Sequence, residues 1–171
     1  TEEGTVMVKD IYEGEDSSDP LDLSSLGNIL FFTAYNDLYG YELWKSDGTE
    51  EGTVMVKDIF PNEGSSLYSS YELTPMGNNI YFIAGDGVYG FELWKSDGTE
   101  SGTVMVKDIK TGASKSFSRD FFSIGETLYF TADYGVYGRE LWKSNGTESG
   151  TVMIKDIQIG SSGSYPSEFS V

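Results

Sequence analysis

Hydrophobic and polar positions follow one pattern that recurs along the whole chain. The segment TVMVKDI begins at Thr5, Thr53 and Thr103 and returns as TVMIKDI at Thr151, at spacings of 48, 50 and 48 residues. A second segment, YGxELWKS, recurs in step with it, 50 and 48 residues apart. Repetition with this period indicates tandem copies of one supersecondary unit. The chain therefore holds three such units and part of a fourth.

Each unit resolves into four short runs that we expect to be strands. The first run has a mixed pattern and covers residues 21–26, 71–76, 120–124 and 168–171. The second (NILFFTA, NIYFIAG or TLYFTAD) is apolar at consecutive positions, which is typical of a strand covered on both faces. The third is ELWKS, and the fourth is TVMVKDI, rich in β-branched residues. Asp-Gly or Asn-Gly between the third and fourth runs predicts a tight turn with positive φ.

Four strands in about 48 residues match the period of a β-propeller blade, in which small twisted sheets pack face to face around an axis. We therefore expect an all-β fold of tandem four-stranded antiparallel blades that form an incomplete ring. A β-solenoid is the competing architecture. The sequence predicts one repeat array over residues 1–171, with units at 1–48, 49–98 and 99–146 and a partial unit at 147–171.

The order of the runs at the two ends bears on the partners. The chain opens on a fourth run and ends on a first run, so these end runs lack the second and third runs that would complete a blade. Bare strand edges invite pairing. We expect either a piece of a larger propeller, completed by further repeats of the same polypeptide, or a chain whose edges are completed by copies of itself. A repeat that does not close yields an open assembly such as a filament.

Composition and charge remove several classes of function. The chain carries 28 acidic and 11 basic residues, a net charge of −17, which makes nucleic acid and anionic membrane surfaces poor partners. No apolar stretch approaches the roughly 20 residues of a membrane helix, so membrane insertion is not expected. Cysteine and histidine are absent, which excludes disulfides, thiol catalysis, the usual zinc sites and any triad built on histidine.

The stretch ELWKSDGTEEGTVMVKDI at residues 42–59 resembles the bacterial ELWxxDGT-repeat family. The similarity covers essentially the whole chain, because the Gly/Ser-rich connection, the short first run and an LYFTA-like second run follow here as they do in the family. The resemblance implies tandem propeller-like modules of secreted or surface proteins, and hence an extracellular or cell-surface location. It implies no enzymatic activity for the repeat itself.

Several residues recur in every unit: Glu42, Glu92 and Glu140; Trp44, Trp94 and Trp142; Lys45, Lys95 and Lys143; Asp10, Asp58, Asp108 and Asp156. We interpret them as requirements of folding, with the tryptophans packing between blades and the charged residues forming pairs that tie strands or turns together. A ligand or Ca²⁺ site in each blade is the alternative. We expect no enzyme and no catalytic residues. A glycoside hydrolase needs a pair of carboxylates, and none of the many possible pairs in this sequence is marked by a unique motif.

The connections from the fourth strand to the next first strand vary most between units, and one of them is two residues longer. In a blade they share an edge with the loops between the second and third strands, and variation on one edge often marks a binding face. Aromatic and acidic side chains suit glycans or protein surfaces, although solvated loops are the alternative. The candidate ligand-binding residues are Tyr35, Asp37, Tyr68, Tyr71, Asp86, Phe117, Asp133 and Tyr134.

Two further sites are suggested by single stretches. Glu15, Asp16 and Asp19 lie in an acidic segment that could bind Ca²⁺, the one possible cofactor, although the order of an EF-hand loop is missing. Asn145 begins an Asn-Gly-Thr glycosylation sequon, but it also occupies the turn position of Asp47 and Asp97.

These observations together predict a non-enzymatic extracellular or cell-surface repeat protein that acts as a structural or interaction module, with adhesion-like contacts to glycans or surface proteins. The alternative is a self-assembling filament subunit whose open edges are completed by strands from neighbouring chains. A glycan-binding lectin or a glycoside hydrolase is a more distant possibility.

Overall fold

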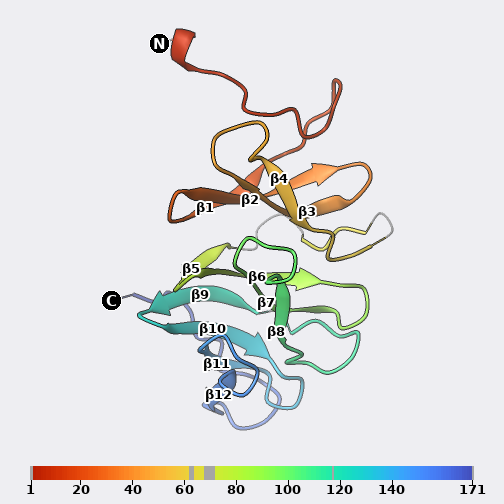
Figure 1. Ribbon diagram of the computed structural model, residues 1–171. Helices are drawn as coiled ribbons and strands as arrows, with labels where there is room; N and C mark the ends of the chain where they lie inside the picture. The colour runs from red at the N-terminus through yellow and green to blue at the C-terminus, as the bar shows by residue number, and fades with distance from the viewer. Residues whose placement is uncertain (1, 62–63, 68–71, 117, 171) are drawn as a thin grey trace.

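The computed structural model describes residues 2–61, 64–67, 72–116 and 118–170. These residues form three four-stranded sheets and no α-helix, and their one helical segment is the short 3₁₀ helix η1 (Glu2–Gly4). Figure 1 shows the three sheets stacked one upon another, with the N-terminal segment extending beyond the first sheet. None of the described residues forms a helix that is long and apolar enough to cross a membrane.

Each sheet is built from consecutive strands in chain order, and every neighbouring pair is antiparallel. The first sheet contains β1 (Leu21–Leu26), β2 (Ile29–Asn36), β3 (Gly40–Ser46) and β4 (Val54–Lys57). The second contains β5 (Thr74–Met76), β6 (Asn79–Gly85), β7 (Phe91–Ser96) and β8 (Val104–Lys107). The third contains β9 (Arg119–Ile124), β10 (Thr127–Asp133), β11 (Arg139–Ser144) and β12 (Val152–Lys155).

This arrangement confirms an all-β fold of tandem, blade-like antiparallel sheets with no closed ring. It rules out the solenoid alternative, because each unit pairs its strands within its own sheet. The first-strand runs of the first and third units are strands as expected. In the second unit the strand is shorter than residues 71–76 and begins at Thr74, and Tyr71 lies outside the described residues. Pro75 is tolerated in this strand because β5 is an edge strand.

The turn between the third and fourth strands forms as the Asp-Gly and Asn-Gly pairs predict. Gly48, Gly98 and Gly146 have positive φ angles of 91°, 86° and 83°. The preceding side chain then accepts hydrogen bonds from the threonine two residues later: Asp47 Oδ1 lies 2.9 Å from Thr49 N and 2.7 Å from Thr49 Oγ1. A local side chain to backbone contact of this kind fixes the turn without help from the rest of the fold.

The cores lie between the sheets, not within them. Phe31 and Leu43 of the first sheet pack against Phe82 and Trp94 of the second. The opposite face of the second sheet repeats the arrangement, and its Tyr81, Ile83 and Leu93 pack against Phe130, Ala132 and Trp142 of the third. The second strand of the second unit is therefore buried on both faces, as its continuous apolar pattern predicts.

The two end runs do not form strands, which corrects the expectation for them. Residues 5–11 are irregular, and Val6 is 77% exposed; residues 168–170 are irregular too, while Val171 lies outside the described residues. A strand needs a neighbour for its backbone hydrogen bonds. Among the described residues no third strand lies beside residues 5–11 and no second strand beside residues 168–170, so neither run can form a ladder.

Candidate functional site

The recurrent glutamate holds the connection that follows the fourth strand. Glu42 is fully buried, and its carboxylate accepts hydrogen bonds from the backbone N–H groups of Ile59, Phe60 and Ser66 and from the Ser66 hydroxyl. Glu140 makes the equivalent bonds to Ile157, Gln158 and Ser164. These residues anchor both ends of the connection, which is a structural task needed in every unit.

Burial also changes the acidity of these glutamates. It raises the pKa of Glu42 to about 7 and that of Glu92 to about 8, even though hydrogen bonds to the carboxylates oppose the shift. Nearby Asp58 and Asp108 add to the rise. Burial acts in the same direction on Glu140, but there the bonds from Ser164, Ile157 and Gln158 together outweigh it and leave the pKa below its ordinary value.

The recurrent lysines link one unit to the next. Lys45 Nζ donates to the carbonyl of Gly98 at 2.7 Å, and Lys95 Nζ donates to that of Gly146 at 2.8 Å. The fourth-strand lysines do the same: Lys57 bonds to Thr103 O and Lys107 to Thr151 O. The expectation of charged pairs is therefore wrong for Lys45 and Lys95, because their acceptors are backbone carbonyls of the following unit.

The long connections and the loops between the second and third strands share one edge of the stack, as predicted. Ser66 joins the two, because its N–H donates to Tyr41 O in the first sheet and its carbonyl accepts from Gly85 N in the second. Ser18 and Ser116 accept in the same way from Tyr35 N and Asp133 N. We call this side of the stack the loop edge; it is formed by residues 12–20, 35–41, 58–61, 64–67, 72–73, 86–90, 110–116, 118 and 133–138.

In the first unit the loop edge carries a cluster of tyrosines. The ring of Tyr35 lies 5.5 Å from that of Tyr12 and 5.2 Å from that of Tyr41, centroid to centroid. The Tyr41 hydroxyl donates to Asp19 Oδ2 at 3.4 Å. Desolvation and, after it, nearby aspartates raise the pKa of both Tyr12 and Tyr41. Beside the cluster is a cavity of about 420 Å³ lined by Ile11, Tyr12, Glu13, Asn36, Asp37 and Leu38.

The other two units present different chemistry at the same edge. Asp86 closes its own loop by accepting from Val88 N and Tyr89 N. Asp133 forms a 2.8 Å ion pair with Lys110. Partial burial raises the pKa of Asp133, but the hydrogen bonds from Lys110 and Gly135 outweigh this effect, and the pKa lies below its ordinary value. The rings of Tyr134 and Tyr137 stack at 6.0 Å.

The structure brings together only part of the predicted ligand-binding set. Tyr35 and Asp37 belong to one neighbourhood in the first unit, whereas Asp86, Asp133 and Tyr134 lie on the loop edges of other units. Tyr68, Tyr71 and Phe117 lie outside the described residues. The ligand-binding set as a whole stays a prediction.

The calcium and glycosylation hypotheses stay predictions. Glu15 and Asp16 are exposed, and Asp19 bonds to Tyr41. Among the described residues no group of three acidic side chains is placed to hold a metal ion. Asn145 is exposed, and its Oδ1 accepts hydrogen bonds from the backbone N–H and the hydroxyl of Thr147, as Asp47 does in its own turn.

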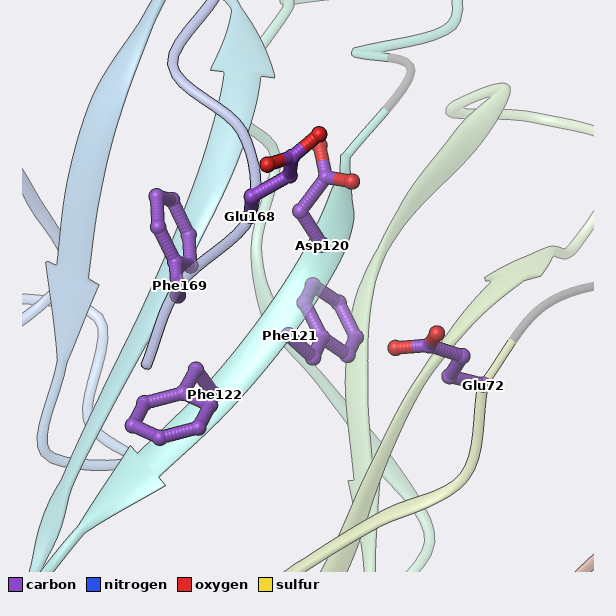
Figure 2. Close-up of a pocket in the computed structure, with 6 residues that line it drawn as sticks. All are labelled: Glu72, Asp120, Phe121, Phe122, Glu168 and Phe169. Carbon is purple, nitrogen blue, oxygen red and sulfur yellow. The ribbon is translucent and has the colours of Figure 1, made fainter. Parts of the chain in front are cut away.

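One cavity involves residues that the sequence reasoning did not select. It has a volume of about 280 Å³ and is lined by Glu72, Asp120, Phe121, Phe122, Glu168 and Phe169. Figure 2 shows these phenylalanine and carboxylate side chains beside β9. An acidic residue near the start of every first run, at Asp22, Glu72, Asp120 and Glu168, was the available signal. Asp22, Asp120 and Glu168 share φ angles of 55° to 58°, and in β1 and β9 a bulge interrupts the register there, which indicates a repeated backbone feature.

Comparison of the chain with protein-family models, with curated proteins and with solved structures found no match.

Proposed function

We propose that this chain is a non-enzymatic interaction module, extracellular or at a cell surface, that makes adhesion-like contacts through its loop edge. The observation that carries the proposal is the contrast between the two sides of the stack. The turns opposite the loop edge repeat the same hydrogen bonds in all three units. The loop edge instead offers a tyrosine cluster in one unit and an ion pair in another.

A neutral glycan is the ligand class that the first unit fits best. Tyr12 and Tyr35 provide aromatic faces next to a cavity of about 420 Å³, and Asn36 and Asp37 line that cavity with amide and carboxylate groups. Aromatic faces with a few polar groups suit the stacking and hydrogen bonding of sugars. The net charge of −17 favours a neutral ligand over an anionic one.

A non-enzymatic role is supported by the work that the buried carboxylates already do. Glu42, Glu92 and Glu140 bind backbone N–H groups of their own connections, and they do so in every unit. Because each of these carboxylates holds the connection of its own unit, folding explains why a glutamate recurs at this position. Binding at the loop edge requires none of these glutamates to change partner.

The test is a glycan array probed with the wild-type protein, Tyr35→Ala and Tyr89→Ala. Tyr35 contacts two other rings of the cluster, whereas Tyr89 lies exposed on the corresponding loop of the second unit. We expect binding to a neutral glycan that Tyr35→Ala loses by at least about tenfold and that Tyr89→Ala retains. The proposal of a glycan ligand fails if folded wild-type protein binds no neutral glycan, or if both variants lose binding equally. Binding to a protein ligand alone would mean that the loop edge recognises a protein and not a glycan.

A further inference from the structure

The outward face of the third sheet carries the side chains that the other two sheets bury against their neighbours. Val56 and Val106 are each 6% exposed between sheets, but their counterpart Ile154 is 44% exposed. Ile157 is 55% exposed, whereas Ile59 and Ile109 at the same place are buried. We call the positions Tyr129, Leu141, Lys143, Ile154, Lys155 and Ile157 the outer face.

Within the described residues, the lysines of the outer face lack the backbone acceptors that their counterparts in the other sheets reach. Lys45 and Lys95 each donate to a glycine carbonyl of the following unit and are half-buried. Lys143, in the same position, is exposed and makes no hydrogen bond or ion pair with any described residue. Lys155 likewise lacks the threonine carbonyl that Lys57 and Lys107 reach. The outer face is thus a donor surface without its acceptors.

The first sheet is the matching acceptor surface. An added methyl group at Gly98 or Gly146 would meet Phe31 or Tyr81 of the preceding unit, whereas at Gly48 it would meet open space. Lys45 also attracts the carboxylate of Asp97, and Gly48 is exposed, whereas its counterparts Gly98 and Gly146 are buried. The apolar side chains Phe32, Ala34 and Trp44 repeat those that the second and third sheets turn toward their predecessors.

Residues 5–11 occupy part of this acceptor surface, and they fit it loosely. Lys9 donates to Thr53 O at 2.9 Å, and Ile11 packs beside Trp44. Val8 nevertheless stays 39% exposed, against the 6% of Val56 and Val106. A cavity of about 240 Å³ lies between this segment and the sheet, and Val8, Lys9, Ile11, Leu30 and Phe32 are among the residues that line it.

We propose that the outer face of one copy of this chain binds the first sheet of a second copy, head to tail, and displaces residues 5–11 from it. Lys143 then bonds to Gly48 O and Lys155 to Thr53 O, which reproduces the two contacts found inside the chain. The two surfaces differ, so each bound copy leaves a further outer face and first sheet free, and the product is a linear oligomer. This proposal rests on the contacts between stacked sheets and not on glycan binding, although Ile11 of the displaced segment also lines the cavity beside the tyrosine cluster.

Sedimentation velocity over a range of protein concentrations tests the proposal, at about 0.5 M salt so that repulsion between acidic copies is short-ranged. We expect the wild-type sedimentation coefficient to rise with concentration. Lys143→Ala should weaken association by roughly tenfold or more, because it removes a charged hydrogen bond. Lys115→Ala, which changes the net charge equally on the loop edge, should leave association unchanged.

A second variant tests the displacement of residues 5–11. Lys9→Ala combined with Ile11→Ser removes the contacts that hold this segment and should strengthen association, and adding Lys143→Ala should cancel the gain. That cancellation separates ordered association from aggregation of a damaged fold. The proposal is overturned if both the wild-type chain and the variant that combines Lys9→Ala with Ile11→Ser stay monomeric up to about 1 mM. Equal effects of Lys143→Ala and Lys115→Ala would overturn it as well.

Discussion

Replacing Lys95 by methionine tests whether contacts between units stabilise the chain. Lys95 Nζ donates to Gly146 O at 2.8 Å across the boundary between the second and third sheets. Methionine keeps most of the apolar stem and removes the charged donor. Lys143→Met is the matched control, since Lys143 holds the same strand position but is exposed and has no acceptor among the described residues.

The expected magnitude follows from the environment of the bond. Gly146 is buried, so the substitution leaves its carbonyl without this donor, and loss of a partner to a buried group costs about 1–3 kcal/mol. For a chain of this length that corresponds to a fall of roughly 2–12 °C in Tm. Lys143→Met should change the free energy of unfolding by no more than about 0.5 kcal/mol, as is usual for an exposed position.

Urea unfolding followed by tryptophan fluorescence measures the difference, at protein concentrations low enough to avoid self-association. Circular dichroism on the same samples checks that the transition is two-state, which repeat arrays do not always satisfy. A shift of the midpoint with an unchanged slope identifies a change in stability alone. If Lys143→Met destabilises the chain as much as Lys95→Met, the bond to Gly146 is not the source of the effect and the reasoning fails.

Three further predictions concern the buried glutamates, the leucines on the sheet faces and the aspartate of the turn. Glu42 and Glu92 have pKa values of about 7 and about 8 in the folded chain, against 4.5 ordinarily, so they bind more protons in the folded chain than in the unfolded one. Their contribution to the free energy of unfolding is therefore complete below about pH 4.5 and is lost as the pH rises through 7 to 8. Urea unfolding at pH 5 and pH 9 should show this loss, and a Glu92→Gln variant with an undiminished pH dependence would refute it. Leu93→Ala, at a fully buried position between sheets, should cost about 2–5 kcal/mol, and Leu141→Ala, its partly exposed counterpart, clearly less; equal costs in denaturant unfolding would contradict the difference between inner and outer faces. Asp97→Ala removes the bonds to Thr99 N and Oγ1 and should cost about 1 kcal/mol, as loss of a comparable side-chain cap does, while Glu100→Ala in the same turn should be nearly neutral in thermal unfolding.

The sequence sufficed wherever structure depends on near neighbours in the chain. The Asp-Gly turn at Asp97 and Gly98 is closed by a side chain bonding two residues ahead, and its residues identify it without tertiary information. The continuous apolar run of β6 identifies a strand covered on both faces, and the packing of Tyr81 and Phe82 against opposite neighbours agrees. The period of the repeat then predicts one sheet per unit.

The sequence did not suffice where a partner lies far along the chain. Lys95 and Gly146 are 51 residues apart, and their bond depends on how two sheets stack, so a pairing of lysine with a nearby carboxylate looked equally reasonable. Ser66 lies in the most variable connection, yet it bonds to Glu42 and joins two units. The end run at residues 5–11 matches the strand sequence but lacks a neighbouring strand, and pairing decides the outcome there.

Within the candidate site, residue type was the easier part to predict and proximity the harder. The aromatic and acidic character of the loop edge is visible in the sequence, and Tyr35 and Asp37 do lie in one neighbourhood. Tyr12 and Tyr41 complete the tyrosine cluster from two different segments, which only the fold brings together. The role of Asp133 as the partner of Lys110, which follows the last strand of the preceding sheet, was hidden for the same reason.

We infer that copies of this chain associate through the same face with which the chain stacks its own units. Amide hydrogen exchange tests this most directly when two equivalent segments are compared: β8 with residues up to Ile109, and β12 with residues up to Ile157. At low protein concentration, where the outer face is free, we predict faster exchange in the β12 segment than in the β8 segment. At high concentration the β12 segment should gain protection toward that of β8, and residues 5–11 should lose any protection they have. Exchange in the β12 segment that is independent of concentration would contradict the account.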